Sequence, residues 1–245
     1  MILDEVLNSI ENEDIEQFAE KCISDFDTYI YVVPASSTGK YHPSYALGEA
    51  GLLRHTVAVA RFLNHMFGVE SIANQFTSRE RDLLRVAALV HDSLKSGTQA
   101  DYEKNKYTKF DHPLLAANKI RSMGGLDKKE REFIAHAIES HMGAFNTDKR
   151  HPDIILPKPQ DKYQIILHLA DYLASRKDIE MQFNDSKNTE INKKNEIPDI
   201  NEWKFNFGKY NGYTIPEVKE KDPGYIKWAK ENLDREPVKT LLKLI

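Results

Sequence analysis

A run of apolar residues that ends in three ionisable side chains constrains this chain more than any other feature. Residues 85–90 (Arg-Val-Ala-Ala-Leu-Val) are typical of a buried helix, and His91, Asp92 and Lys95 follow them. Isolated charges are costly to bury, so such groups are expected to be paired or bound to a metal. The pattern therefore predicts that His91 and Asp92 are metal ligands and that Lys95 faces a phosphate.

Four other predicted helical segments place a histidine or an aspartate among apolar residues or at a helix terminus. A lone histidine on an apolar face is more often a packed core residue than a ligand, but a whole set of them favours a shared site. Imidazole and carboxylate suit divalent first-row metals, and the absence of thiolates argues against a structural zinc site. Four ligands would hold one ion, whereas six would hold two, with Asp92 able to bridge them. The candidate ligands are His55, His91, Asp92, His112, His141 and Asp171.

Helical spacing of apolar residues dominates residues 1–183, so the predicted fold is mainly α. Residues 29–33 (Tyr-Ile-Tyr-Val-Val) differ, because β-branched and aromatic side chains predict a strand or an extended buried segment. Residues 146–159, rich in proline and charge, predict a loop. Helices are predicted over 3–23, 50–67, 78–94, 127–142 and 160–181, and a further one begins near residue 112.

Two polar segments lie next to the predicted ligands in the sequence. Residues 34–48, marked by Gly and Pro, predict a loop that lines a pocket or forms a plain surface turn, and they carry Lys40 and His42. Residues 98–110 predict a second loop with several lysines, including Lys109. Charge runs are usually solvated, but this one joins two ligand segments, so we expect it to contact a phosphate.

The composition changes near residue 184. Residues 184–201 are rich in Asn, Lys and Glu, which predicts a linker. Residues 202–245 predict a small second unit with both α and β structure, in which aromatic residues alternate around Asn211-Gly212, a strong signal for a type I′ hairpin. Helices are expected to begin at Pro216 and at Asp222-Pro223.

Charge and cysteine content restrict the function classes. A net charge of −4 argues against a general nucleic-acid binder, although it allows a local basic cleft. The one cysteine, Cys22, cannot form an intrachain disulfide, which fits a reducing cytosol, and the N-terminus lacks a signal-peptide pattern. No apolar run approaches the ~20 residues of a membrane helix. We therefore expect a cytoplasmic protein that does not bind membranes.

His55 in Gly-Leu-Leu-Arg-His-Thr, the His91-Asp92 pair with Lys95, and Asp171 in Ala-Asp-Tyr resemble the HD superfamily of metal-dependent phosphohydrolases. The resemblance covers roughly residues 30–180 and implies an HD-domain helical bundle over 1–183. It further implies that His55, His91, Asp92 and Asp171 are the shared metal ligands. His112 and His141 occupy the positions of the extra histidines of binuclear subgroups, which favours two ions (Mn, Fe, Co, Ni or Mg). His136 could replace or assist His141.

Two further likenesses bear on the substrate. The stretch Pro34-Ala, Lys40-Tyr-His-Pro43 and Gly51-Leu-Leu-Arg-His-Thr56 resembles the YhaM-like HD exoribonucleases, but no obvious N-terminal OB-fold accompanies it, so their activity does not simply transfer. Residues 207–215 and 221–228 resemble the C-terminal module of exodeoxyribonuclease X-like proteins, which accompanies nucleic-acid enzymes. Exposed aromatic and basic residues there are expected to stack on and neutralise a strand, although Trp228 could equally belong to the core of the module. The residues concerned are Lys209, Tyr210, Lys227 and Trp228.

The leading hypothesis is a two-metal phosphohydrolase that acts on a nucleotide or single-stranded nucleic acid, with a phosphodiesterase or nuclease preferred because of the C-terminal module. Asp92 and Lys95 are the predicted catalytic residues, and Lys40, His42, Lys95 and Lys109 are the predicted substrate-binding residues. One alternative is a nucleotidase or dNTP phosphohydrolase, and another is a di-iron oxygenase of the same fold. A third is a non-catalytic nucleic-acid-binding protein with a structural metal. The oligomeric state stays open.

Overall fold

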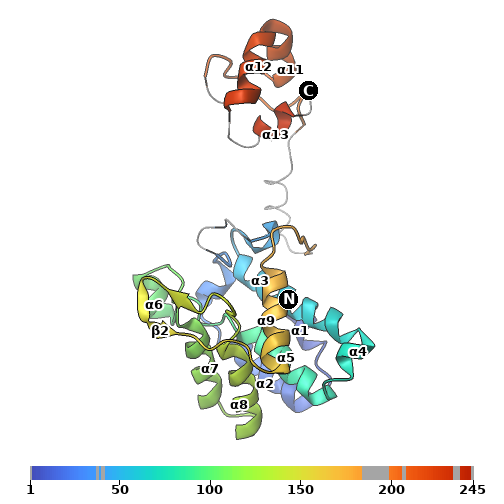
Figure 1. Cartoon of the computed structure of the whole chain (residues 1–245), viewed down its shortest axis with the longest axis vertical. Helices are drawn as coiled ribbons and strands as arrows, with labels where there is room; N and C mark the ends of the chain where they lie inside the picture. Colours follow the sequence, from blue (N-terminus) through green and yellow to red (C-terminus); the bar gives the residue numbers. More distant parts are fainter. Residues whose placement is uncertain are drawn as a thin grey trace. The chain divides into compact units, whose positions relative to one another are not determined.

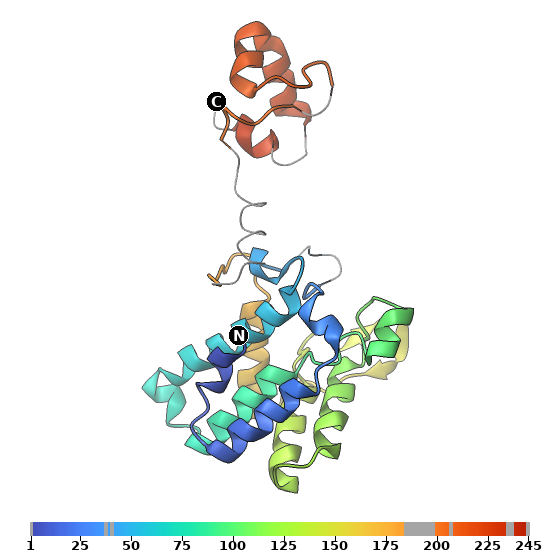
Figure 2. The same ribbon diagram turned by 180° about the vertical axis from the view of Figure 1, so that it is seen from behind.

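The structure is a computed structural model of the chain, and it describes residues 2–36, 39, 42–183, 199–205, 208–233 and 238–243. The chain divides into two compact units, Met1–Ile191 and Asn192–Ile245 (Figures 1 and 2). Each unit has its own hydrophobic core. Most of the predicted linker, residues 184–198, lies outside the described residues, so the domain boundaries stay a prediction.

The first unit is a bundle of helices, which confirms the prediction of a mainly α fold. Helix α3 (Gly51–Phe67) packs against α5 (Ser78–Val90) and α9 (Lys162–Ala174), and α5 also contacts α8 (Lys128–Glu139). Helix α7 (His112–Ser122) lies alongside α8 in both views of the ribbon. Shorter elements surround this bundle: α1 (Asp4–Leu7), α2 (Glu13–Ser24), η1 (Thr28–Tyr31), η2 (Ser44–Ala46), α4 (Glu70–Ala73) and α6 (Gln99–Lys104).

Side-chain caps fix the starts of the helices that carry the candidate ligands. Thr77 and Glu80 form a capping box at the start of α5. The carboxylate of Asp127 accepts the backbone N–H of Glu130 at the start of α8, and Asp161 caps α9 in the same way. These bonds satisfy N–H groups that have no partner inside the helix, so they define where each helix begins.

The single helix predicted over residues 3–23 is wrong, because the chain breaks between α1 and α2. The buried carboxylate of Asp82 in α5 accepts the backbone N–H groups of Glu11 and Asn12, each at 2.9 Å. The same carboxylate binds the Arg85 guanidinium at 2.5 Å. A contact across 70 residues of sequence therefore ends one helix and starts the next, which local spacing does not reveal.

Three local predictions in this unit are also wrong. Residues 28–31 form the 3-10 helix η1 rather than a strand or an extended segment, and Tyr29 and Ile30 are buried in the helical core. Residues 98–110 contain α6, which a capping box at Thr98 begins. Residues 146–159 contain a two-stranded antiparallel sheet of β1 (Thr147–Asp148) and β2 (His151–Ile155). Most of its side chains are exposed, so it lacks the alternating apolar pattern by which strands are found.

The second unit contains α11 (Ile215–Lys221), α12 (Pro223–Asn232) and α13 (Val238–Leu242) around a small apolar core. Lys204 and Thr214 form an isolated antiparallel bridge, so the chain does return on itself as predicted. The two-residue type I′ turn is wrong, however. The N–H of Gly212 donates to the carbonyl of Phe205, and Asn211 lacks the positive φ that such a turn requires. The connection is therefore a longer loop.

In the part of the chain that the structure describes, no helix is both long and apolar enough to cross a bilayer.

Candidate metal centre

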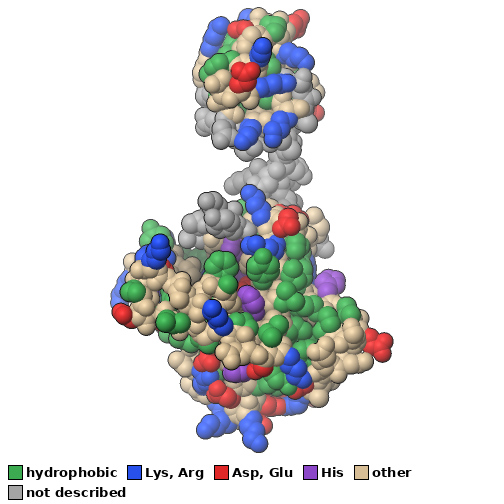
Figure 3. All heavy atoms as spheres, in the orientation of Figure 1, with side chains coloured by type: hydrophobic (Ala, Val, Ile, Leu, Met, Phe, Trp, Pro, Cys, Tyr) green, Lys and Arg blue, Asp and Glu red, His purple; other side chains and the backbone are tan. Residues whose placement is uncertain are grey.

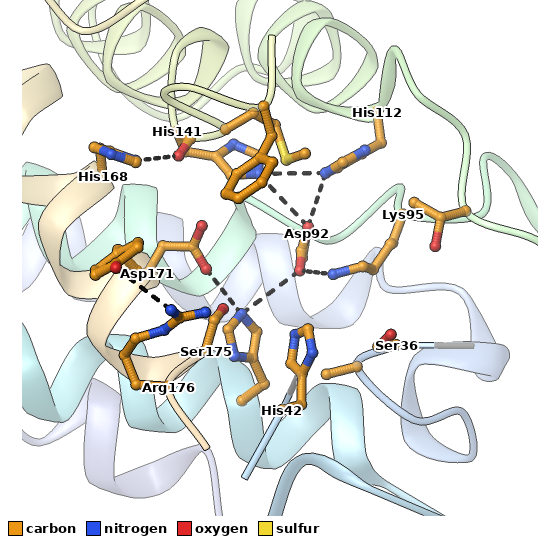
Figure 4. A pocket seen from close by; sticks show the side chains of 16 residues that line it. Ser36, His42, Asp92, Lys95, His112, His141, His168, Asp171, Ser175 and Arg176 are labelled. Carbon is orange, nitrogen blue, oxygen red and sulfur yellow. Dashed lines mark hydrogen bonds and ion pairs between the residues drawn. The ribbon is translucent and has the colours of Figure 1, made fainter. Parts of the chain in front are cut away.

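The six predicted ligands come together in the first unit at a cavity of about 550 Å³, and Figure 4 draws the ones that line it. They come from α3, from the end of α5, from the start of α7, from the residue pair after α8, and from α9. Five of them line the cavity, and His91 lies fully buried beside them. The six are His55, His91, Asp92, His112, His141 and Asp171. Residues spread over more than a hundred positions therefore converge on one site.

The two carboxylate oxygens of Asp92 face different histidines. Oδ1 lies 3.0 Å from Nε2 of His112 and 3.7 Å from Nε2 of His141. Oδ2 lies 3.7 Å from Nε2 of His55 and 3.5 Å from Nε2 of His91. Asp92 thus stands between two histidine pairs and contacts one pair with each oxygen. Figure 4 labels His112 and His141, the pair that faces Oδ1.

Asp171 completes one side of the cluster. Its Oδ1 lies 3.0 Å from Nε2 of His55 and 3.8 Å from Nε2 of His91. Among the described residues, three overlapping groups have ligand atoms close enough to share an ion. These groups are His55, His91 and Asp92; His91, His141 and Asp171; and Asp92, His112 and His141.

Backbone carbonyl groups orient three of the four histidines. Nδ1 of His91, His112 and His141 each lies 2.7–2.8 Å from the carbonyl oxygen three residues earlier. A carbonyl only accepts hydrogen bonds, so Nδ1 must carry the proton and Nε2 must present its lone pair. Nε2 of His91 is buried and has no hydrogen-bond partner in the part of the chain that the structure describes, an arrangement that a metal ion would satisfy. Carbonyl partners of this kind commonly orient metal-binding histidines.

The protonation states also fit metal binding. Burial lowers the pKa of His141 to about 3 and also lowers the pKa of His91, so both rings are neutral near pH 7. Burial alone would raise the pKa of the two aspartates, but the charge of Lys95 at Asp92 and a hydrogen bond from His55 at Asp171 outweigh it. They hold the pKa of Asp92 and of Asp171 well below the ordinary value. Neutral imidazoles and ionised carboxylates are the forms that bind metals.

The predicted substrate-binding residues are not all brought to the cluster. Lys95 lines the cavity, with Nζ 2.5 Å from Oδ2 of Asp92. His42 also lines it, and burial lowers its pKa to about 4. Lys109 instead lines a separate cavity, and its Nζ pairs with Asp101 at 3.1 Å. Lys40 lies outside the described residues.

His136 does not join the cluster. Its side chain is half exposed, and its Nε2 pairs with the carboxylate of Asp161 at 2.7 Å. His141 rather than His136 therefore faces the other ligands. The difference arises because α8 ends at Glu139, so the chain turns away from the helical course before it reaches His141.

The stretch that precedes the first ligand is shaped by a glycine and a buried arginine. A Cβ at Gly51 would lie 2.3 Å from the carbonyl oxygen of Ala46, so only glycine permits this close approach. The Arg54 side chain is fully buried, and its guanidinium donates to the carbonyl groups of Leu47 and Glu49. In the Gly-Leu-Leu-Arg-His sequence, the glycine and arginine therefore hold the loop while the histidine faces the cavity.

A buried tyrosine holds the segment that follows Asp92. The hydroxyl of Tyr29 accepts the backbone N–H of Ser96 at 3.2 Å and donates to the carbonyl of Gly97 at 2.9 Å. Tyr29 thus fixes the turn that carries Lys95. Nothing in the sequence connects residue 29 with this turn, so spacing alone does not identify its role.

His168 contacts the backbone of the segment that carries His141. Its Nδ1 lies 2.7 Å from the carbonyl oxygen of His141. Gly143 makes room for this ring, because a Cβ there would lie 2.1 Å from Cε1 of His168. The backbone of Gly143 also has a φ of +55°, which glycine adopts readily. His168 and Gly143 together position the segment that carries His141.

The cavity also contains residues that sequence reasoning missed. Tyr172 lines it from the last turn of α9, Ser175 and Arg176 line it from just after the end of that helix, and Phe145 lines it from the loop after α8. Ser175 lies four residues after Asp171 and so falls on the same helix face, which was an available signal. Phe145 carried no comparable signal, because a single aromatic residue in a loop is common.

Comparison with known proteins identifies both units. The family model for the HD domain matches residues 52–176, and the model for the exodeoxyribonuclease X-like C-terminal region matches residues 205–234. Exodeoxyribonuclease 10 from two strains of Escherichia coli, K12 and O6:H1, is 53% identical over 30 residues. The matched part is 12% of this chain and 14% of each of those relatives. No solved structure matches the chain.

Proposed function

Because the chain belongs to the HD-domain family, we propose that it hydrolyses phosphodiester bonds of single-stranded nucleic acid with two divalent metal ions. HD-domain proteins are generally phosphohydrolases that bind divalent metals. The observation that carries the proposal of two ions is the position of Asp92, whose two oxygens face separate histidine pairs. A carboxylate in that position can bridge two ions.

The ligand set divides naturally around Asp92. One ion would be held by His55, His91, Asp171 and the Oδ2 atom of Asp92. The other would be held by His112, His141 and the Oδ1 atom of Asp92. Metal ions in such sites lower the pKa of bound water and polarise phosphoryl oxygens. Manganese, iron, cobalt and nickel all suit this mixture of imidazole and carboxylate.

Lys95 and His42 are the described side chains that we assign to the substrate phosphate. The Lys95 ammonium lies at the cavity beside the cluster, where it would offset the negative charge of a phosphate. His42 lines the same cavity, and its buried Nδ1 has no hydrogen-bond partner among the described residues. Lys109 is not assigned this role, because its side chain pairs with Asp101 at another cavity.

The second unit supports nucleic acid as the substrate. Its sequence is similar to part of exodeoxyribonuclease 10, a relative whose name describes cleavage of DNA. Trp228 is 48% exposed, so it is available to stack on a base, and Lys227 and Lys209 are also exposed. Tyr210 is not available, because it is only 6% exposed and belongs to the core of the unit.

A nucleotidase or dNTP phosphohydrolase is the second candidate, and the size of the cavity favours it. A volume of about 550 Å³ lies within the range of small-molecule sites, so it would accommodate a mononucleotide. The oxygenase alternative requires oxygen uptake with iron. The non-catalytic alternative requires strand binding without hydrolysis.

The test is a substrate panel assayed with manganese, cobalt and iron. It contains single-stranded RNA and DNA oligonucleotides, each NTP and dNTP, cyclic nucleotides and a chromogenic phosphodiester. We expect hydrolysis of oligonucleotides and of the diester without oxygen uptake. Turnover of the mononucleotides alone would replace the nuclease proposal with the nucleotidase.

The variant Asp92→Asn tests the metal assignment in the same assay. We expect it to lose bound metal and to lose more activity than the ~10–100-fold that removal of an outer-shell partner typically costs. Asp153→Asn, at an exposed position in β2, is the matched control and should keep both properties. Full metal content and activity in Asp92→Asn would refute the assigned site.

A further inference from the structure

Two exposed aromatic rings stand at the candidate metal centre. Phe145 is 64% exposed and Tyr172 is 41% exposed, and both line the cavity that holds the ligand cluster. Hydrophobic side chains gather over α9 on the face drawn in Figure 3, with histidine atoms visible among them. Large apolar groups beside a polar catalytic cluster leave apolar area in water, which favours a ligand that covers it.

The Tyr172 ring belongs to the same helical turn as Asp171, one of the proposed metal ligands. Tyr172 follows Asp171 in α9, and Arg176 lies four residues later, just beyond the end of that helix. The Arg176 guanidinium lies 4.5 Å from the centre of the Tyr172 ring, and its Nη1 lies 3.4 Å from the tyrosine hydroxyl. Arg176 thus holds the ring in place beside the metal ligand.

Arg176 also has unused hydrogen-bonding capacity. Its Nε is buried and has no hydrogen-bond partner among the described residues. A buried N–H without a partner is costly, so an acceptor on a ligand would be stabilising there. The guanidinium and the ring therefore present a flat surface next to a polar donor, which is the chemistry that recognises a heteroaromatic base.

We propose that Tyr172, Phe145 and Arg176 form a nucleoside subsite that stacks the base of the nucleotide next to the scissile phosphate. This subsite rests on the proposed phosphodiesterase function, whose phosphate it places at the cluster. With this subsite, the proposed substrate is a nucleotidyl ester rather than any phosphodiester. Tyr172 and Phe145 act as specificity-determining residues, and Arg176 is a positioning residue for the Tyr172 ring.

The test compares two esters that share one leaving group. The p-nitrophenyl ester of thymidine 5′-monophosphate carries a nucleoside, and methyl p-nitrophenyl phosphate does not. The ratio of their kcat/KM values measures the nucleoside subsite. We expect Tyr172→Leu to lower this ratio about tenfold, because leucine offers no aromatic ring on which the base can stack. Tyr172→Phe keeps the ring and should keep the ratio within about twofold of the original protein, on the same stacking argument.

Leu169→Ala is the matched control, because Leu169 is also exposed on α9 but does not line the cavity. Its ratio should equal that of the original protein. An unchanged ratio in Tyr172→Leu, or an equal fall in Leu169→Ala, overturns the subsite. If neither ester is hydrolysed by the original protein, the proposed phosphodiesterase function itself fails, and this outcome is distinct from failure of the subsite.

Discussion

At the scale of single residues, the buried neutral histidines make a prediction about stability. Burial lowers the pKa of His141 to about 3 and lowers that of His91, whereas the unfolded chain keeps the ordinary value of 6.5. Below pH 6.5 the unfolded state therefore binds more protons, so the free energy of unfolding falls as the pH falls toward 3. We expect protonation of the unfolded state at His141 to lower the free energy of unfolding by about 1.5–2 kcal/mol between pH 6.5 and pH 5, and His91 acts in the same direction.

Urea unfolding of metal-free protein at a series of pH values measures this slope. His141→Gln should reduce the slope, because one buried imidazole no longer titrates between the two states. His65→Gln is the control, since His65 is exposed at the end of α3, and its slope should match that of the original protein. Equal slopes in all three proteins would contradict a depressed pKa at His141.

The residue scale is also where the sequence was most informative. His55, His91 and Asp171 were predicted as ligands because ionisable groups stand out in apolar helices, and the structure places their side chains next to one another. Arg176 and Phe145 were missed, because cationic and aromatic side chains at helix ends and in loops are common. Their role depends on which cavity they line, and that depends on packing rather than on local pattern.

At the scale of elements, the segment after α8 depends on one glycine. A side chain at Gly143 would overlap the His168 ring and would also have to adopt a left-handed backbone conformation. We expect Gly143→Ala to lower the free energy of unfolding by about 2–4 kcal/mol, as the sum of the conformational cost and of overpacking. It should also weaken metal binding, because His168 contacts the carbonyl group of His141.

Gly124→Ala provides the comparison for that variant. Gly124 has a negative φ, and its nearest neighbour to an added Cβ is the end of the Lys21 side chain at 4.0 Å. We expect its thermal unfolding and manganese titration to match those of the original protein. If Gly143→Ala and Gly124→Ala unfold at the same temperature and bind manganese equally well, then the close contact between Gly143 and His168 does not affect stability or metal binding.

Element boundaries were predicted less well than element types. The helix containing His55 was predicted over 50–67 and forms over Gly51–Phe67, because apolar spacing and packing agree there. The break between α1 and α2 was missed, since it depends on the Asp82 carboxylate in another helix. The small sheet of residues 147–155 was missed because its side chains are mostly exposed. Long-range polar contacts and exposed strands leave no periodic signal.

At the scale of the whole molecule, the two units have separate hydrophobic cores, and we expect them to have different functions. The first unit contains the candidate ligand cluster and its cavity, and the second contains a small core with Trp228 exposed. A tethered second binding surface raises the local concentration of a long substrate at the first, without any change in the catalytic cavity. The second unit should therefore matter for oligonucleotides and not for small esters.

We expect a protein of residues 1–191 to hydrolyse the thymidine p-nitrophenyl ester with an unchanged kcat/KM. Its KM for a long single-stranded oligonucleotide should rise at least ~10-fold, because the avidity of linked sites is lost. Within the full chain, Trp228→Ala should raise the same KM, whereas Trp228→Phe should not, since a phenyl ring still stacks. An unchanged KM for the oligonucleotide in residues 1–191 would mean that the second unit binds no strand, and the choice of nucleic acid over a mononucleotide would then rest on the catalytic cavity alone.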